Sequence, residues 1–167
     1  MSILENRIGC PVLRNRVKTV EEVLPLFKDG MNLGWSGFTP VGYPKALPKA
    51  LADHVEANNL QGKLRFNLLV GASVGTETED RWASLDMISR RWPYQSGKNI
   101  QKGINSGRIR MNDKHLSMFA QDLMYGFYTK DLGESLTLAS SKPRPSPPKG
   151  HHSSRFRRHR QRDYSDR

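Results

Sequence analysis

The sequence is poor in cysteine and has no long apolar run, and both features restrict where the protein works. Cys10 is the only cysteine, so an internal disulfide is excluded and a reducing compartment is favoured. No apolar stretch approaches the roughly 18 residues that a membrane-spanning helix requires. We therefore expect no membrane partner.

Several catalytic signatures are also missing. The chain has no Cys/His pair, no Ser/His/Asp arrangement that can be placed, no HExxH and no P-loop lysine motif. Three neighbouring acids, Glu77, Glu79 and Asp80, could bind a cation, but their spacing matches no metal loop and a solvated helix start is the favoured interpretation. We expect neither a metal site nor a resident cofactor.

Aliphatic side chains are missing from the end of the chain. After Leu138 no Leu, Ile, Val or Met occurs. Residues 131–167 hold 9 Lys and Arg against 4 Asp and Glu, whereas residues 1–130 hold 18 against 12, so the net charge of +11 is concentrated at this end. Such a segment cannot bury enough apolar surface to offset the entropy of ordering it. We predict a disordered, basic tail, rich in Pro, Ser and Arg, over residues 131–167.

The basic run Arg155–Arg162 resembles nuclear-targeting and nucleic-acid patches, which is an unspecific signal. We favour translation through an intron or out of frame over an evolved RNA-binding tail. A nucleic-acid partner is therefore not expected.

At the other end lies an arm, residues 1–16. Its arginines, with Lys18, could form a weak mitochondrial presequence, but Glu5, Gly9 and Pro11 interrupt that pattern. We expect a cytoplasmic protein, with a mitochondrial location as the alternative.

The first half of the chain has the pattern strand, glycine loop, helix, strand. A short apolar stretch ends near Trp35, Gly37 and Gly42 follow, and an amphipathic pattern predicts a helix from Pro44 to about Asn58. The β-rich run Leu64–Val70 follows a turn. This order predicts a βαβ unit, and therefore an α/β fold with a parallel sheet.

Two loops that follow these strands are the candidate site. Parallel units bind ligands beyond the carboxyl ends of their strands, and glycines let the backbone approach a ligand closely. The first loop contributes Gly37, Phe38, Gly42 and Pro44, and the second contributes Gly71, Ala72 and Ser73. The alternative, that both loops are ordinary turns, stays open at this point.

Periodicity and capping signals predict further elements. Thr19 and Glu22 have capping-box spacing and open a helix that Pro25 shortens or kinks. His54 is expected to be a packed or surface residue, and His115 either caps a helix or lies near a substrate. The later predictions are helices over Arg81–Trp92, Asn99–Ser106 and Leu116–Met124, a strand over Gly107–Met111 and the start of a strand over Gly126–Thr129.

The glycine loop and several other runs resemble one enzyme family. The pattern Gly37-Phe38-x-x-x-Gly42-x-Pro44 is similar to the glycine loop of class I coenzyme A transferases. Over about residues 17–130 the chain also resembles the N-terminal part of fungal acetyl-CoA hydrolase, a relative of acyl-CoA:carboxylate CoA-transferases. The runs that carry this similarity are Leu33–Thr39, Lys45–Leu51, Asp53–Glu56, Asn59–Leu68, Val70–Ser73, Arg81–Trp82, Asp113–Phe119 and Gln121–Tyr128.

The resemblance implies acyl-CoA chemistry by way of a glutamate. In such transferases a glutamate carboxylate attacks the thioester to form an acyl-glutamyl anhydride, and backbone N–H groups stabilise the oxyanion. That glutamate lies in the C-terminal part of the family's sequence, which has no counterpart here. We therefore assign no catalytic residue to this chain and expect residues 17–130 to be an incomplete, class I CoA-transferase-like domain.

The expected function is that of an acetyl-CoA hydrolase or CoA-transferase family member in acetate metabolism, catalytically incomplete by itself. Its ligands would be acyl-CoA and small carboxylates, with coenzyme A as substrate or product. Two alternatives stay open: a non-catalytic chain that associates with the full-length enzyme and regulates it, and a basic nucleic-acid binder that acts through the tail.

Overall fold

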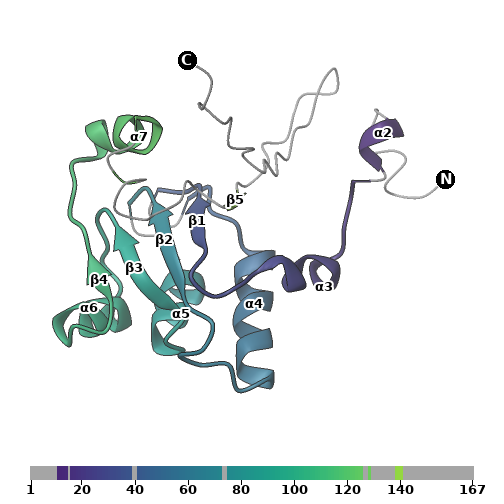
Figure 1. Cartoon of the computed structure of the whole chain (residues 1–167), viewed down its shortest axis with the longest axis horizontal. Helices are drawn as coiled ribbons and strands as arrows, with labels where there is room; N and C mark the ends of the chain where they lie inside the picture. Colours follow the sequence, from purple (N-terminus) through teal and green to yellow (C-terminus); the bar gives the residue numbers. More distant parts are fainter. Residues whose placement is uncertain are drawn as a thin grey trace, which may run out of the picture.

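The described part of the chain is built around one parallel sheet. The computed structural model describes residues 11–14, 16–38, 41–72, 75–125, 128 and 138–140. Five strands lie in the order β4-β3-β2-β1-β5, and every neighbouring pair is parallel (Figure 1). The strands are β1 Asn32–Trp35, β2 Phe66–Val70, β3 Ile88–Trp92, β4 Arg110–Met111 and β5 Leu138–Ser140. The predicted parallel α/β fold is confirmed.

Short helices precede and connect the strands. They are α2 Pro11–Arg14, α3 Val20–Val23, the 3₁₀ turn Leu24–Leu26, α4 Ala46–Ala57, the π-helical turn Thr76–Asp80, α5 Arg81–Ser84, α6 Lys98–Asn105 and α7 Leu116–Met124. The predicted capping box is present, because the Glu22 amide donates to Thr19 Oγ1 and the Thr19 amide donates to the Glu22 carboxylate. Pro25 lies in the 3₁₀ turn that follows, so the predicted shortening of this helix is also confirmed. Within the described residues no helix has the length and apolar character needed to cross a membrane.

The main core lies between one face of the sheet and helices α3 to α6. The strands contribute the buried side chains Leu33, Trp35, Phe66, Leu68, Val70 and Ile88, and α4 contributes Leu51, Ala52 and Val55. Trp82 of α5 is fully buried at the centre, with its ring 4.5 Å from Trp35 and 5.3 Å from Phe66 between centroids. Its indole N–H donates to the carbonyl of Pro48 at 2.9 Å, so the polar atom of this large ring is satisfied and ties α5 to α4.

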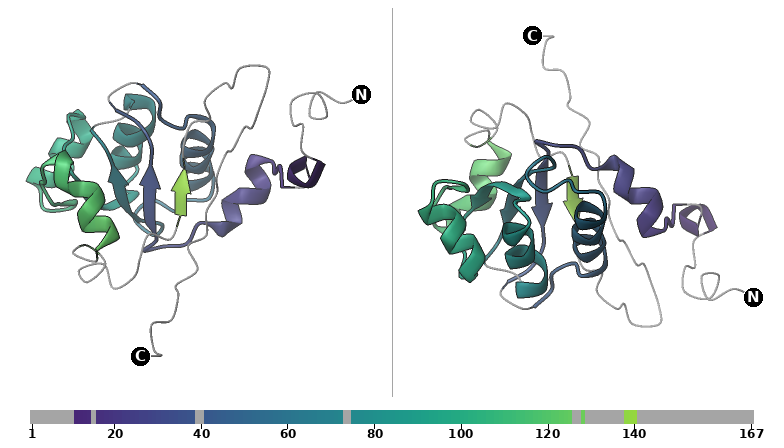
Figure 2. Two further views of the ribbon diagram at one scale, coloured as in Figure 1. Left: turned by 90° about the horizontal axis from the view of Figure 1, so that it is seen from above. Right: turned by 90° about the horizontal axis from the view of Figure 1, so that it is seen from below.

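The opposite face of the sheet carries a smaller core. Leu69 of β2 and Trp92 of β3 are buried there beside Tyr128, and Phe119 and Leu123 of α7 lie against them. Figure 2 shows α7 on the side of the sheet away from α5. Helices therefore cover both faces, as a parallel sheet requires.

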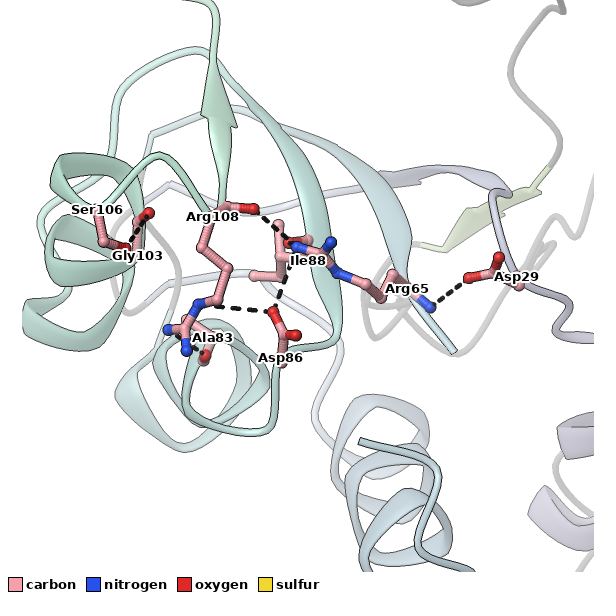
Figure 3. A network of polar contacts seen from close by, with 8 residues as sticks. All are labelled: Asp29, Arg65, Ala83, Asp86, Ile88, Gly103, Ser106 and Arg108. Carbon is pink, nitrogen blue, oxygen red and sulfur yellow. Dashed lines mark hydrogen bonds and ion pairs between the residues drawn. The ribbon is translucent and has the colours of Figure 1, made fainter. Parts of the chain in front are cut away.

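Charged side chains join the amino ends of the strands (Figure 3). Asp29, Arg65, Asp86 and Arg108 each stand shortly before a different strand. Arg65 Nη2 donates to the carbonyl of Arg108 at 2.8 Å and lies 3.2 Å from Asp86 Oδ1. Arg108 Nε lies 3.5 Å from the same Asp86 oxygen, and the Arg65 amide donates to Asp29 at 2.7 Å. We call these four residues the amino-edge network. It holds the beginnings of four strands together, at the edge of the sheet opposite the loops described below.

The helix predicted over Arg81–Trp92 is wrong in its second half. Helix α5 ends at Ser84, Asp86 has a positive φ of 53°, and Ile88–Trp92 forms strand β3. A bulge in the pairing between β2 and β3 leaves out Ser89, so Ile88 faces the main core while Trp92 faces the smaller one. The bulge removes the period-2 pattern that would have indicated a strand, and only a spacing that resembles a helix is left.

The sheet also extends beyond the domain limit expected at residue 130. Leu138–Ser140 pairs in parallel with Leu33–Trp35 as an edge strand. The predicted disordered tail from residue 131 is therefore wrong at these three residues. The strand predicted over Gly126–Thr129 lies outside the described residues except for Tyr128.

Candidate functional site

The loops at the carboxyl ends of β1, β2 and β3 lie at one edge of the sheet, because the strands are parallel. The loop after β1 contains the first predicted set. Gly37 has a φ of 136° and Gly42 a φ of 76°, conformations that other residues rarely adopt. The backbone conformation therefore favours glycine at both positions, as predicted.

This glycine loop, residues 36–44, is closed by its own hydrogen bonds. The Phe38 amide donates to the Val41 carbonyl at 3.0 Å, and the Val41 amide donates back to Phe38 at 3.2 Å. The Ser36 hydroxyl donates to the Gly42 carbonyl at 2.8 Å. Phe38 and Val41 nevertheless expose 61% and 69% of their surfaces, so these two apolar side chains face outward.

The structure brings the two predicted loops into contact. A Cβ atom added to Gly71 would lie 2.8 Å from the carbonyl oxygen of Gly37, closer than real Cβ atoms come to backbone. Glycine at position 71 therefore allows the second loop to lie directly against the first. Ala72 is buried next to it, and Ser73 lies outside the described residues.

The sequence predicted that Pro44 opens the following helix, but in the structure it does not. It is buried, and α4 begins two residues later at Ala46. The residue that caps α4 is Lys45, whose side chain makes no capping hydrogen bond. Lys45 thus leaves the first amides of α4 without a cap from its side chain, and these amides point toward the carboxyl edge where the glycine loop lies.

A tyrosine that the sequence did not single out anchors the glycine loop. The ring of Tyr43 is buried in the main core, and its hydroxyl donates to the Glu77 carboxylate. This hydrogen bond is the main reason that the pKa of Tyr43 is raised and the pKa of Glu77 is lowered. The Lys45 ammonium lies 3.8 Å from the same carboxylate and 5.0 Å from the centre of the Tyr43 ring.

The acidic patch is not the solvated helix start that we expected. Glu79 is buried and binds the fully buried Arg91 in a bidentate ion pair, with Nε–Oε1 and Nη2–Oε2 distances of 2.7 and 3.1 Å. Asp80 accepts the amides of Asn99 and Ile100 and so caps α6. The three carboxylates of this patch face three different partners, and the described residues contain no group of three or more potential metal ligands.

The described structure contains two histidines, of which His115 is exposed and His54 is half-buried. His115 caps α7, with the Ser117 amide donating to Nδ1 at 3.4 Å, so the capping interpretation is confirmed. His54 lies within α4, with its Nδ1 3.2 Å from the Asn58 side-chain amide. Neither histidine belongs to the loops described above.

Comparison with known proteins identifies the family of this chain. The family model described as "Acetyl-CoA hydrolase/transferase N-terminal domain" matches residues 12–144. The chain belongs to the acetyl-CoA hydrolase/transferase family. The resemblance to this family is thereby confirmed, and the match continues past residue 130 to residue 144, so that it includes β5.

Curated relatives in this family are close in sequence but much longer. The acetyl-CoA hydrolase of Saccharomyces cerevisiae is 62% identical over 137 residues, which cover 82% of this chain and 26% of the relative. That of Neurospora crassa is 59% identical over 128 residues, which cover 77% and 24%. That of Schizosaccharomyces pombe is 60% identical over 138 residues, which cover 82% and 26%. The chain spans about a quarter of the length of these relatives.

Proposed function

We propose that this chain supplies the glycine-loop part of an acyl-CoA site in a thioester hydrolase or CoA-transferase. One observation carries the proposal: in a domain of the acetyl-CoA hydrolase/transferase family, the loop holding Gly37 and Gly42 lies at the carboxyl edge of the sheet, against Gly71. The uncapped start of α4 lies next to this loop. Backbone N–H groups in such a place suit the oxygen of a thioester carbonyl, which gains negative charge when it is attacked.

The proposed reaction requires a carboxylate from outside the described residues. A glutamate attacks the thioester carbon, the carbon–sulfur bond breaks, coenzyme A leaves as a thiolate that takes up a proton, and an acyl-glutamyl anhydride forms. Water then cleaves the anhydride to release acetate and the free glutamate. In the transfer reaction the coenzyme A thiolate instead attacks the glutamyl carbonyl of the anhydride, which releases acetate and leaves a glutamyl-CoA thioester, and an acceptor carboxylate takes up coenzyme A from this thioester by the same steps in reverse. The chemistry uses coenzyme A as substrate and product and needs no further cofactor.

Apart from Glu21, which lies in the first turn of α3, the glutamates of the described part are bonded to other residues, and this supports a nucleophile from outside it. Glu22 completes the capping box, Glu56 binds Arg81, and Glu77 and Glu79 hold Tyr43 and Arg91. None of these carboxylates stands free beside the glycine loop. The role of the chain is therefore to position the thioester and to stabilise its oxyanion.

A thiol-release assay with acetyl-CoA tests the proposal. The purified 167-residue chain is assayed alone, and again with the separately expressed remainder of the Saccharomyces cerevisiae relative. We expect thiol release only from the mixture, together with acetyl-CoA binding by the chain alone. Robust turnover by the chain alone would refute the claim that the nucleophile comes from outside it. A chain that neither binds acetyl-CoA nor activates the remainder would refute the claim that it contributes to an acyl-CoA site.

A second candidate, association with the full-length enzyme without catalysis, is favoured by the outer surface of α7. Leu116, Met118, Met124 and the following Tyr125 are exposed by 40%, 44%, 76% and 82%. Exposed apolar side chains on one short helix suit a protein partner. Co-purification of the tagged chain with the full-length enzyme, lost in a Met124→Lys/Tyr125→Lys variant, would support this candidate.

A further inference from the structure

Through its three carboxylates, the turn Thr76–Asp80 binds the glycine loop, strand β3 and the start of α6. Glu77 accepts from Tyr43 of the glycine loop, Glu79 binds Arg91 of β3, and Asp80 caps the start of α6. The sequence separation of Tyr43 from Glu77 is 34 residues, so the contact joins two different βα connections.

This turn is firmly held on the side away from the glycine loop. Glu79 and Arg91 expose only 2% and 0% of their side chains, and Arg91 also donates to the carbonyls of Trp92 and Tyr94. Asp80 accepts a further hydrogen bond from the Asn99 side chain at 2.8 Å. Buried, fully bonded ion pairs hold their partners in one geometry. Glu77 is therefore mounted on a rigid base.

Glycine at position 75 leaves room for the contact between Tyr43 and Glu77. A Cβ atom there would collide with the Tyr43 hydroxyl and would lie 2.5 Å from Glu77 Oε2. Gly75 has a φ of −26°, which lies outside the left-handed region that favours glycine. The space, rather than the conformation, explains this residue.

The contact contributes little to the overall stability of the fold. The Glu77 side chain is 51% exposed, and solvent screens hydrogen bonds and ion pairs at such sites. Its consequence is local, because Tyr43 directly follows Gly42 and its buried ring terminates the glycine loop.

We propose that Glu77 is a positioning residue for the acyl-CoA site, which holds Tyr43 and thereby sets the glycine loop against the thioester. The inference rests on the proposed function, but its structural half can be tested separately. Glu77 acts through Tyr43 and touches no reacting atom.

Amide hydrogen exchange on the 167-residue chain tests the structural half. The reporters are the amides of Phe38 and Val41, which bond to each other across the loop. We expect Tyr43→Phe and Glu77→Ala each to speed exchange of these amides about tenfold, as the loss of one charge-assisted hydrogen bond implies. The double variant should be no faster than either single one, and Glu77→Gln, which keeps an acceptor, should be intermediate.

Glu56→Ala is the matched control. The side chain of Glu56 is 48% exposed, which is similar to the 51% of Glu77, and it also bonds a side chain, that of Arg81. Glu56 lies on α4, away from the glycine loop. This control should leave the loop amides at the wild-type rate. If Tyr43→Phe and Glu77→Ala also leave them at that rate, the positioning contact is refuted.

Acetyl-CoA affinity and the KM of the reconstituted mixture test the functional half. We expect Glu77→Ala to weaken acetyl-CoA binding and to raise KM about tenfold, Glu77→Gln to have an intermediate effect, and Glu56→Ala to change neither. Unchanged binding and KM in Glu77→Ala would overturn the inference. The wild-type chain could instead bind no acetyl-CoA while exchange of its loop amides still responds to the substitutions. That result would show that the proposed function is wrong but that the contact between Tyr43 and Glu77 positions the loop.

Discussion

Removal of the Glu79 charge should destabilise the domain far more than removal of any exposed carboxylate. Glu79 and Arg91 are 2% and 0% exposed and form two hydrogen bonds of 2.7 and 3.1 Å. The variant Glu79→Gln is nearly isosteric but leaves the Arg91 charge buried without its counter-ion. Breaking a buried pair from one side costs about 3–5 kcal/mol. Gln keeps one acceptor oxygen, so we expect a loss near 3 kcal/mol.

The matched control is Glu56→Gln, which removes the same charge at a site where the side chain is 48% exposed. Arg81 keeps a second partner there, because its Nη1 lies 2.7 Å from Asp53. Exposed ion pairs contribute about 0–1 kcal/mol, so the control should lose less than about 1 kcal/mol.

Urea unfolding followed by tryptophan fluorescence measures both variants, since Trp82 and Trp92 are fully buried. With slopes of about 1–3 kcal/mol per molar urea, the midpoint of Glu79→Gln should fall by roughly 1–3 M. Equal midpoints for the two variants would refute the assignment of Glu79 and Arg91 to a buried ion pair.

Four further predictions concern the loops and the amino edge. Gly71→Ala should force its Cβ against the Gly37 carbonyl and weaken acetyl-CoA binding, measured by calorimetry, whereas unchanged affinity would contradict the loop contact. Tyr43 should titrate above its ordinary pKa of about 10 in ultraviolet difference spectra, and Glu77→Gln should lower that pKa; a single unshifted titration in both would contradict it. Because the pKa of Glu77 is lowered, the stabilisation from its hydrogen bond is present above the unfolded pKa of about 4.3 and is lost as the pH falls through the lower folded value. The difference in unfolding free energy between wild type and Glu77→Gln should therefore shrink as the pH falls below the unfolded pKa. Asp86→Asn should lower the urea midpoint yet leave acetyl-CoA affinity unchanged, because it weakens only the amino-edge network.

The βαβ unit could be predicted from sequence because its signals are local. The apolar stretch before Trp35, the glycines at 37 and 42 and the amphipathic stripe of α4 each indicate their own conformation, and parallel topology then puts the two loops at one edge. The contact between Gly37 and Gly71 follows that rule, although its closeness appears only in coordinates.

The errors arose where distant contacts decide local structure. Arg90 and Arg91 lie in β3, where two consecutive charges do not suggest a buried strand, and Arg91 is tolerated there only because Glu79 supplies a counter-ion from another loop. The bulge at Ser89 then hides the alternation of the strand. The hydrogen bond from Tyr43 to Glu77 likewise has no signal within either segment, and only the physical chemistry of a buried tyrosine, whose hydroxyl needs a partner, could have suggested a search for one.

Amide chemical shifts of the isotope-labelled chain during titration with acetyl-CoA test the central claim most directly. If the loops at the carboxyl edge receive the thioester, the largest changes will fall on the amides of Gly37, Gly42 and Gly71, and those of Arg65 and Asp86 at the amino edge will stay in place. Saturable changes centred on the amino edge, or none at millimolar ligand, would contradict the claim.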